Sequence, residues 1–211
     1  MADNYLENKF EELRDRAKRP APRKANTLDT LLARNRSYRG YDKKVVVGMS
    51  TLEKIVAVNT KIPSARNQQV LRFKLVTRDS GADNVLANIK MGGALPELHL
   101  PFEGTEPEAF IIVCSTEPES KLVDIDLGIA AQSMLLKAVD LGLNGLMIGA
   151  FNKSAITEAF ALKYEPLLIL AIGKGAETIR LTEIREGESH RYYRENDVHY
   201  VPKVALADLL L

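Results

Sequence analysis

The stretch that decides the fold is residues 123–149, VDIDLGIAAQSMLLKAVDLGLNGLMIG. Residues 123–141 are apolar on nearly every face of a helix, which is typical of a helix inside a core or at a subunit interface. Asp124 and Asp126 lie at its start, where carboxylates favour the helix dipole. Gly142 then provides a stop, and residues 146–148 have the composition of a buried strand. A buried helix next to a buried strand predicts a domain in which helices cover a sheet.

Helices and strands alternate along the rest of the chain after residue 27. Further strands are expected at 70–77, 109–114 and 167–173, with a strand-like piece after residue 191. Further helices are expected after a Thr27 cap, from Thr51 to before Pro63, and at 82–90 and 153–162. The pattern predicts an α+β fold.

The two ends of the chain differ from this regular part. Residues 5–18 carry apolar side chains at helical spacing, and residues 19–24 are basic with two prolines. We therefore divide the chain into an N-terminal amphipathic helix with a basic linker, residues 1–26, and a main domain, residues 27–211. Residues 204–211 are mostly apolar and need a partner surface, for example another subunit.

The composition excludes several classes of protein. The 211 residues are 45% hydrophobic and 27% charged with a net charge of +1, which is globular and gives no field that would recruit nucleic acid. Cys114 is the single cysteine, in an apolar run where a buried thiol is expected. The three histidines lack metal-ligand spacing, so no metal is expected. With neither a signal peptide nor a membrane-spanning stretch in view, we expect a cytoplasmic protein without membrane contact.

Two polar segments carry residues suited to a ligand. Arg36, Ser37 and Arg39 place two guanidinium groups and a hydroxyl within one turn, and such groups suit phosphate and carbonyl edges. Residues 62–69, IPSARNQQ, follow a helix with a Pro-Ser turn and several amide donors. A solvated helix end and a solvated loop would carry similar residues.

In their order and spacing these two segments and residues 123–149 resemble the nitroreductase family of FMN-dependent oxidoreductases. The family has an Arg-x-Ser-x-Arg/Lys motif, whose first arginine meets the FMN phosphate and whose last basic residue lies near the pyrimidine edge of the flavin. Ser37 and Arg39 match this motif. Asn35 occupies the first position, so the resemblance leaves Arg34 or Arg36 to supply the charge.

The resemblance implies roles for further residues in three places. Residues 63–69 are similar to the family's Pro-Ser-x-x-Asn-x-Gln loop, which comes from the opposite subunit and contacts the flavin. The residues it carries over are Pro63, Ser64, Ala65 and Asn67. The segment Ile148, Gly149 and Ala150 is expected to offer backbone N–H groups to the flavin ring, and Lys203 is expected to close on the phosphate.

The resemblance also implies an architecture and an activity. The expected fold is nitroreductase-like, with a central mixed or antiparallel sheet flanked by helices, in an intertwined homodimer that holds FMN at the interface. NAD(P)H would give a hydride to the flavin and leave before a small acceptor, such as a nitroaromatic or a quinone, takes its place. No side chain is expected to act as a catalytic acid or base, since the flavin carries the chemistry.

Other functions stay open at this point. Reductive dehalogenation or flavin breakdown would use the same motifs. A non-catalytic flavin sensor or storage protein would bind FMN without useful turnover. A third alternative is an interaction protein that binds partners through residues 14–24. The loop at residues 91–102, with Gly92 and Gly93 as a hinge, is a candidate wall of the substrate site.

Overall fold

The structure, a computed structural model, describes residue 9, residues 26–93 and residues 98–211. The N-terminal helix and linker expected at residues 5–24 lie outside this part apart from Lys9, as does the middle of the loop at 91–102. Within the described ranges, no helix combines the length and hydropathy that crossing a membrane requires.

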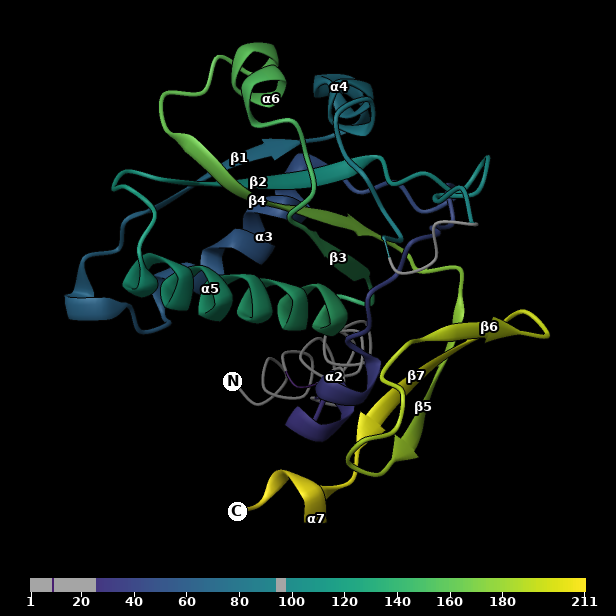
Figure 1. Ribbon diagram of the computed structural model, residues 1–211. Helices are drawn as coiled ribbons and strands as arrows, with labels where there is room; N and C mark the ends of the chain where they lie inside the picture. The colour runs from purple at the N-terminus through teal and green to yellow at the C-terminus, as the bar shows by residue number, and fades with distance from the viewer. Residues whose placement is uncertain (1–8, 10–25, 94–97) are drawn as a thin grey trace.

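An antiparallel sheet forms the centre of the fold (Figure 1). Its strands are β1 (Leu71–Val76), β2 (Ala109–Ser115), β3 (Asn144–Ile148) and β4 (Glu165–Gly173). They are arranged in the order β1-β2-β4-β3. All seven residues of β2 are buried, because helices cover the sheet on both faces. This burial explains why the first six residues of β2, AFIIVC, are a continuous apolar run.

Helices cover both faces of the sheet. On one face lie α5 (Lys121–Asp140) and α3 (Met49–Val56), and on the other lie α4 (Ala82–Leu86) and α6 (Lys153–Ala159). The Ser120 hydroxyl caps α5 by accepting the Val123 N–H at 3.4 Å. Gly142, with a φ of 82°, ends the helix as expected, since glycine adopts this conformation without strain. A shorter helix, α2 (Leu28–Arg34), begins at the predicted Thr27 cap and packs on α5.

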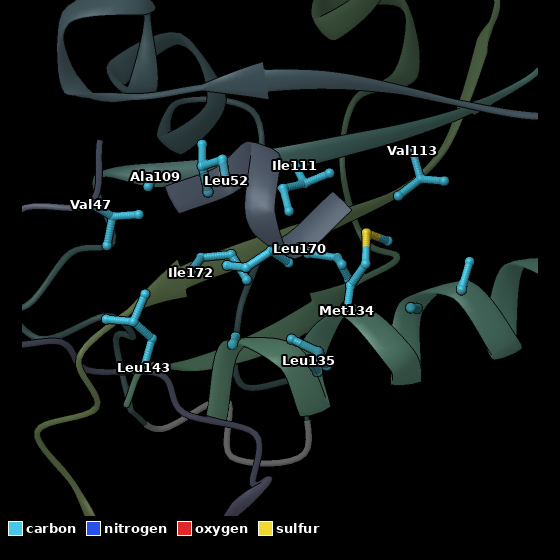
Figure 2. Packing of buried hydrophobic residues seen from close by; sticks show 14 residues of the cluster. Val47, Leu52, Ala109, Ile111, Val113, Met134, Leu135, Leu143, Leu170 and Ile172 are labelled. Atoms are coloured by element: carbon cyan, nitrogen blue, oxygen red, sulfur yellow. The ribbon is translucent and has the colours of Figure 1, made fainter. Parts of the chain in front are cut away.

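The strand β2 supplies both halves of the core. Ile111 and Val113 point toward α3 and α5. Leu52 of α3, Met134 of α5 and Leu170 of β4 belong to the same cluster, seen in Figure 2. The alternate residues, Phe110, Ile112 and Cys114, belong to the cluster under α4 and α6. Cys114 is therefore a buried thiol, and burial raises its pKa to about 11.

A second, smaller sheet follows β4 and lies beside α2 (Figure 1). It consists of β5 (Thr178–Ile184), β6 (Tyr193–Glu195) and β7 (Val198–Val204), followed by α7 (Leu206–Leu209). β7 is central, parallel to β5 and antiparallel to β6. The sequence predicted a strand after residue 191 but not β5. An antiparallel central sheet with a small mixed sheet confirms the α+β class.

The helix predicted from Thr51 to before Pro63 differs at both ends. It begins at Met49, and its α-helical part ends at Val56, followed by the 3₁₀ turn η1 (Ala57–Thr60). The side chains of Asn59 and Thr60 bond the carbonyl oxygens of Val56 and Ala57 at 2.8 and 2.9 Å. These local bonds compete with the α-helical ladder and stop it before Pro63 is reached.

Two other predicted helices are shorter than expected. The helix at 82–90 ends at Leu86, because Lys90 donates its N–H to Ala150 at 2.8 Å and the chain pairs with the segment after β3. The helix at 153–162 ends at Ala159, because Ala161 adopts a positive φ of 46°. Both ends depend on contacts or backbone angles that helix propensity does not encode.

Gly145 in β3 lies against α5 with no room for a side chain. A Cβ atom built there would lie 2.5 Å from Leu135 Cδ2 and 2.7 Å from the Ala171 backbone oxygen. We expect Gly145→Ala to lower the free energy of unfolding by about 1–3 kcal/mol, because the backbone of β4 would have to move. Urea denaturation followed by circular dichroism measures this change.

Gly128 provides the matched control. It is exposed on α5, and a Cβ atom built there meets nothing within 4 Å. Gly128→Ala should leave stability unchanged or raise it by up to about 1 kcal/mol, since alanine favours the helix. If Gly145→Ala were as stable as Gly128→Ala, the close packing of α5 on β3 would be wrong.

Candidate functional site

A cavity of about 330 Å³ lies where the segment after α2, the helix α5, the strand β3 and the small sheet meet. Arg36, Ser37, Arg39 and Lys203, four of the residues predicted from sequence, line it together. We call it the cationic cavity. Its remaining wall is largely apolar, with Leu135 of α5, Met147 of β3, Ile179 of β5 and Val201 of β7.

The segment after α2 is held in place from two sides. Asn35 donates its side-chain amide N–H to Gln132 Oε1 on α5 at 3.2 Å. Tyr38 donates its backbone N–H to the Gly145 carbonyl at 3.2 Å, and Ser37 pairs with Gly145 along the outer edge of β3. Asn35 therefore anchors the segment to α5 instead of supplying the charge that the family motif has there.

The two arginines of this segment keep unused donors at the cavity. Arg36 donates from Nη2 to the Leu32 carbonyl at 2.5 Å, and Arg39 donates from Nη1 to the Ser37 carbonyl at 3.2 Å. The Nε atoms of both are buried without a partner. Arg39 also lies over the ring of Tyr192, with its guanidinium carbon 5.0 Å from the centroid. Burial lowers the pKa of Arg36, although the nearby Tyr38 opposes the change.

Glu177 connects this segment to the small sheet. Its carboxylate accepts the backbone N–H groups of Arg39 and Gly40, the latter at 2.7 Å, and pairs with Arg194 of β6. His199 Nδ1 of β7 lies 3.7 Å from its Oε2 atom. Burial alone would raise the pKa of Glu177, but His199, the two backbone N–H groups and Arg194 outweigh it and lower the pKa to about 2. Glu177 is therefore an ionised carboxylate that fixes the backbone of Arg39.

The predicted Pro-Ser loop lies at a different cavity. Pro63 and Ser64 line a cavity of about 520 Å³ with Asp126 of α5 and residues of α3 and β1, which we call the loop cavity. Asp126 is buried, and its Oδ1 atom accepts the Ala65 N–H at 2.8 Å. Arg66 and Asn67 adopt positive φ angles of 52° and 55° within the 3₁₀ turn η2 (Ala65–Asn67). No residue of this loop lines the cationic cavity of the same chain.

The three residues predicted at the end of β3 line neither cavity. Ile148 is buried in the core cluster under α4 and α6, whereas Gly149 and Ala150 are exposed. The carbonyl of Ala150 accepts the Lys90 N–H at 2.8 Å. Met147, the residue of β3 before Ile148, lines the cationic cavity instead.

Sequence reasoning missed Glu177, His199 and Tyr192. Glu177 stands alone among small residues, and its partners come from the distant positions 39, 194 and 199. The alternation in TIRLTEI could have predicted β5, but no local pattern identifies the partly buried carboxylate before it. Among the residues that the structure describes, no group of three His, Cys, Asp or Glu could hold a metal ion.

Comparison of the sequence with models of known protein families identifies the family of this chain. The model of the Nitroreductase family matches residues 32–174. The chain belongs to the nitroreductase family. A protein from Methanocaldococcus jannaschii that bears a nitroreductase name is 30% identical over 92 residues, which are 40% of this chain and 46% of that protein. The chain thus matches about half the length of this curated relative.

Solved structures of nitroreductase-family proteins have the same fold. One from Exiguobacterium sibiricum 255-15, in complex with FMN, has a TM-score of 0.59 at 22% identity and covers 74% of this chain and 91% of its own. Another, a variant of the FMN- and NADPH-dependent nitroreductase NfnB from Sphingopyxis sp. strain HMH, has a TM-score of 0.57 at 17% identity, covering 72% and 89%. The nitroreductase-like fold expected from the sequence is confirmed.

The ionised state of Glu177 gives a prediction on stability. At neutral pH, Glu177→Gln should lower the free energy of unfolding by about 2 kcal/mol, because the hydrogen bonds and the ion pair lose their charged acceptor. Since the folded-state pKa is about 2 against an ordinary 4.5, this contribution is complete above pH 4.5 and decreases as the pH falls toward 2. Urea denaturation across this pH range measures the difference between variant and wild type.

Glu183→Gln is the matched control, since Glu183 is exposed on β5 and lines neither cavity. This variant should resemble the wild type at every pH. A Glu177→Gln variant equally destabilised at neutral and at acidic pH would show that the carboxylate is not held ionised by its partners.

Proposed function

We propose that this nitroreductase-family protein is an FMN-dependent oxidoreductase that moves a hydride from NAD(P)H to a small acceptor such as a nitroaromatic or a quinone. The observation that carries the proposal is the cationic cavity, where Arg36, Ser37, Arg39 and Lys203 meet an apolar wall. The FMN complex from E. sibiricum and the dependence of NfnB on FMN and NADPH support the choice of cofactor and donor.

The residues of the cationic cavity fit FMN. Its volume of about 330 Å³ lies within the range of small-molecule sites, roughly 300–1,000 Å³. The buried Nε atoms of Arg36 and Arg39 have no partner in the protein and can donate to phosphate or carbonyl oxygens. The side chains of Leu135, Met147 and Val201 offer an apolar surface to a planar ring.

Each part of the cavity has a separate task in this proposal. FMN, when bound, supplies the hydride chemistry itself. Arg39, fixed through its backbone by Glu177, holds a positive charge where negative charge develops in the ligand, which stabilises that charge. Arg36 and Lys203 hold the phosphate. The mechanism requires no catalytic acid or base from the protein.

We also propose a homodimer in which the loop of one protomer reaches the cationic cavity of its partner. Pro63 and Ser64 line the loop cavity, and none of Pro63, Ser64, Ala65 and Asn67 lines the cationic cavity of the same chain. Large apolar side chains that a second copy could cover are exposed on α5 and at the C-terminus. They are Leu122, Ile125, Leu206, Leu209, Leu210 and Leu211.

The visible absorption spectrum of the purified protein tests the proposed function. We expect a flavin spectrum that bleaches when NADPH or NADH is added without oxygen, because hydride transfer reduces the flavin. A flavin spectrum that persists would instead indicate a flavin-binding protein without turnover. Absence of flavin, together with failure to bind added FMN, would contradict the proposal.

The position of Arg39 gives a second prediction. Arg39→Ala should weaken FMN binding by about tenfold or more, because a charge-assisted hydrogen bond is lost. It should also lower the reduction potential of whatever flavin remains bound. Titration of the apoprotein with FMN, followed by flavin fluorescence, measures the first effect.

Arg180→Ala is the matched control for this experiment. Arg180 is exposed on β5 and does not line the cationic cavity, so its removal changes the net charge equally without touching the site. If the two variants bound FMN alike, and with the same potential, Arg39 would have no place in the site.

A further inference from the structure

His199 faces the cationic cavity with its Nε2 atom unpartnered. The residue is 1% exposed, and it lies on β7 with Val201 and Lys203, whose alternate positions direct all three toward the cavity. Nδ1 has the Glu177 carboxylate 3.7 Å away, whereas Nε2 has no hydrogen-bond partner within the protein. Buried polar groups almost always have a partner, so an unpartnered Nε2 in a cavity wall indicates contact with a ligand.

Glu177 determines which ring nitrogen carries a proton. Its Oε2 atom lies 3.7 Å from Nδ1, and an ionised carboxylate can only accept hydrogen bonds. Nδ1 is therefore the protonated nitrogen in both charge states of the ring. The variable atom is Nε2, which accepts a hydrogen bond when the ring is neutral and donates one when the ring is charged.

The groups around His199 suit an anion. Arg194 of β6 is its neighbour across the strand pair and forms an ion pair with Glu177. The Tyr192 ring packs on the imidazole of His199, with the ring centroids 5.1 Å apart. The guanidinium group of Arg39 also lies over the Tyr192 ring. The cations that share the cavity are Arg36, Arg39 and Lys203. These cations attract an anionic ligand, and a negative charge brought next to Nε2 would stabilise a proton there.

We propose that His199 takes up a proton at Nε2 when a ligand brings negative charge into the cationic cavity, and that it then donates a hydrogen bond to the charged group. The inference rests on the proposed function in so far as the ligand is FMN. Two parts of FMN can supply the charge, namely the phosphate on binding and the ring on two-electron reduction. The proton comes from solvent, so each such event consumes up to one proton at this residue.

Calorimetry tests the phosphate as the source of charge. FMN is titrated into the apoprotein at about pH 7.5, above the ordinary range of histidine, in phosphate-free buffers of different ionisation heat. If the phosphate meets His199, the wild type takes up as much as one proton more than His199→Gln. Protons bound or released by the phosphate itself are common to both proteins and cancel in this difference. Riboflavin, which lacks the phosphate, would then show no such difference.

Potentiometry tests the ring as the source of charge. The midpoint potential of the FMN-loaded protein is measured between about pH 6.5 and pH 8.5. If the reduced ring meets His199, the midpoint potential of the wild type falls more steeply with pH than that of His199→Gln. The difference in slope is up to about 30 mV per pH unit, because 30 mV corresponds to a tenfold change in the equilibrium constant of a two-electron couple. His190→Gln, at an exposed histidine outside the cavity, should match the wild type in both experiments.

Nitrogen-15 NMR of histidine-labelled wild type gives a readout that does not depend on a variant's folding. The chain has three histidines, so His99→Gln and His190→Gln assign two of the rings and leave the third to His199. We expect its nitrogen shifts to change from neutral to charged on FMN binding or on reduction. A His199 ring that stays neutral in both steps, or proton uptake that His199→Gln retains in full, would overturn the inference. Failure of the wild type to bind FMN would instead overturn the proposed function.

Discussion

One partly buried carboxylate connects the parts of the candidate site. Glu177 binds the backbone of Arg39 and Gly40 on one side and Arg194 of the small sheet on the other. Burial disfavours its charge, but the donors around it keep its pKa near 2. The carboxylate therefore remains ionised and fixes the distance between the segment after α2 and the strands that carry His199 and Lys203. The cationic cavity lies between these two parts.

The helix α5 anchors both sequence motifs from one rigid element. Gln132 binds Asn35 beside the cationic cavity, and Asp126 binds Ala65 beside the loop cavity. The two anchoring residues are separated by about 9 Å along a helix that rises about 1.5 Å per residue. Because α5 also packs its small and apolar residues against the central sheet, its position is set by the core. In the proposed homodimer, the two motifs that meet at one ligand would come from different protomers.

The sequence predicted those parts of the fold in which burial follows chain periodicity. The apolar run of β2, the long apolar helix with its glycine stop and the Thr27 cap all appear where they were expected. Helix ends were predicted less well, because they depend on side-chain bonds such as that of Asn59 or on pairing such as that of Lys90 with Ala150. β5 was missed although its residues alternate.

The candidate site was predictable only in part. Arg36, Ser37, Arg39 and Lys203 came from short motifs and meet in one cavity. Glu177 and His199 could not be found in this way, since each has meaning only through residues far away in the chain. The role of Asn35 was also hidden, because a position that carries an arginine in the family instead carries an amide that binds α5.

The most direct measurement is a crystal structure of the protein grown with FMN. The account predicts electron density for FMN between Arg39 and Lys203 of one protomer, with residues 63–67 of the partner subunit against the same ligand. FMN bound instead in the loop cavity beside Asp126, or held entirely by a single chain, would contradict it.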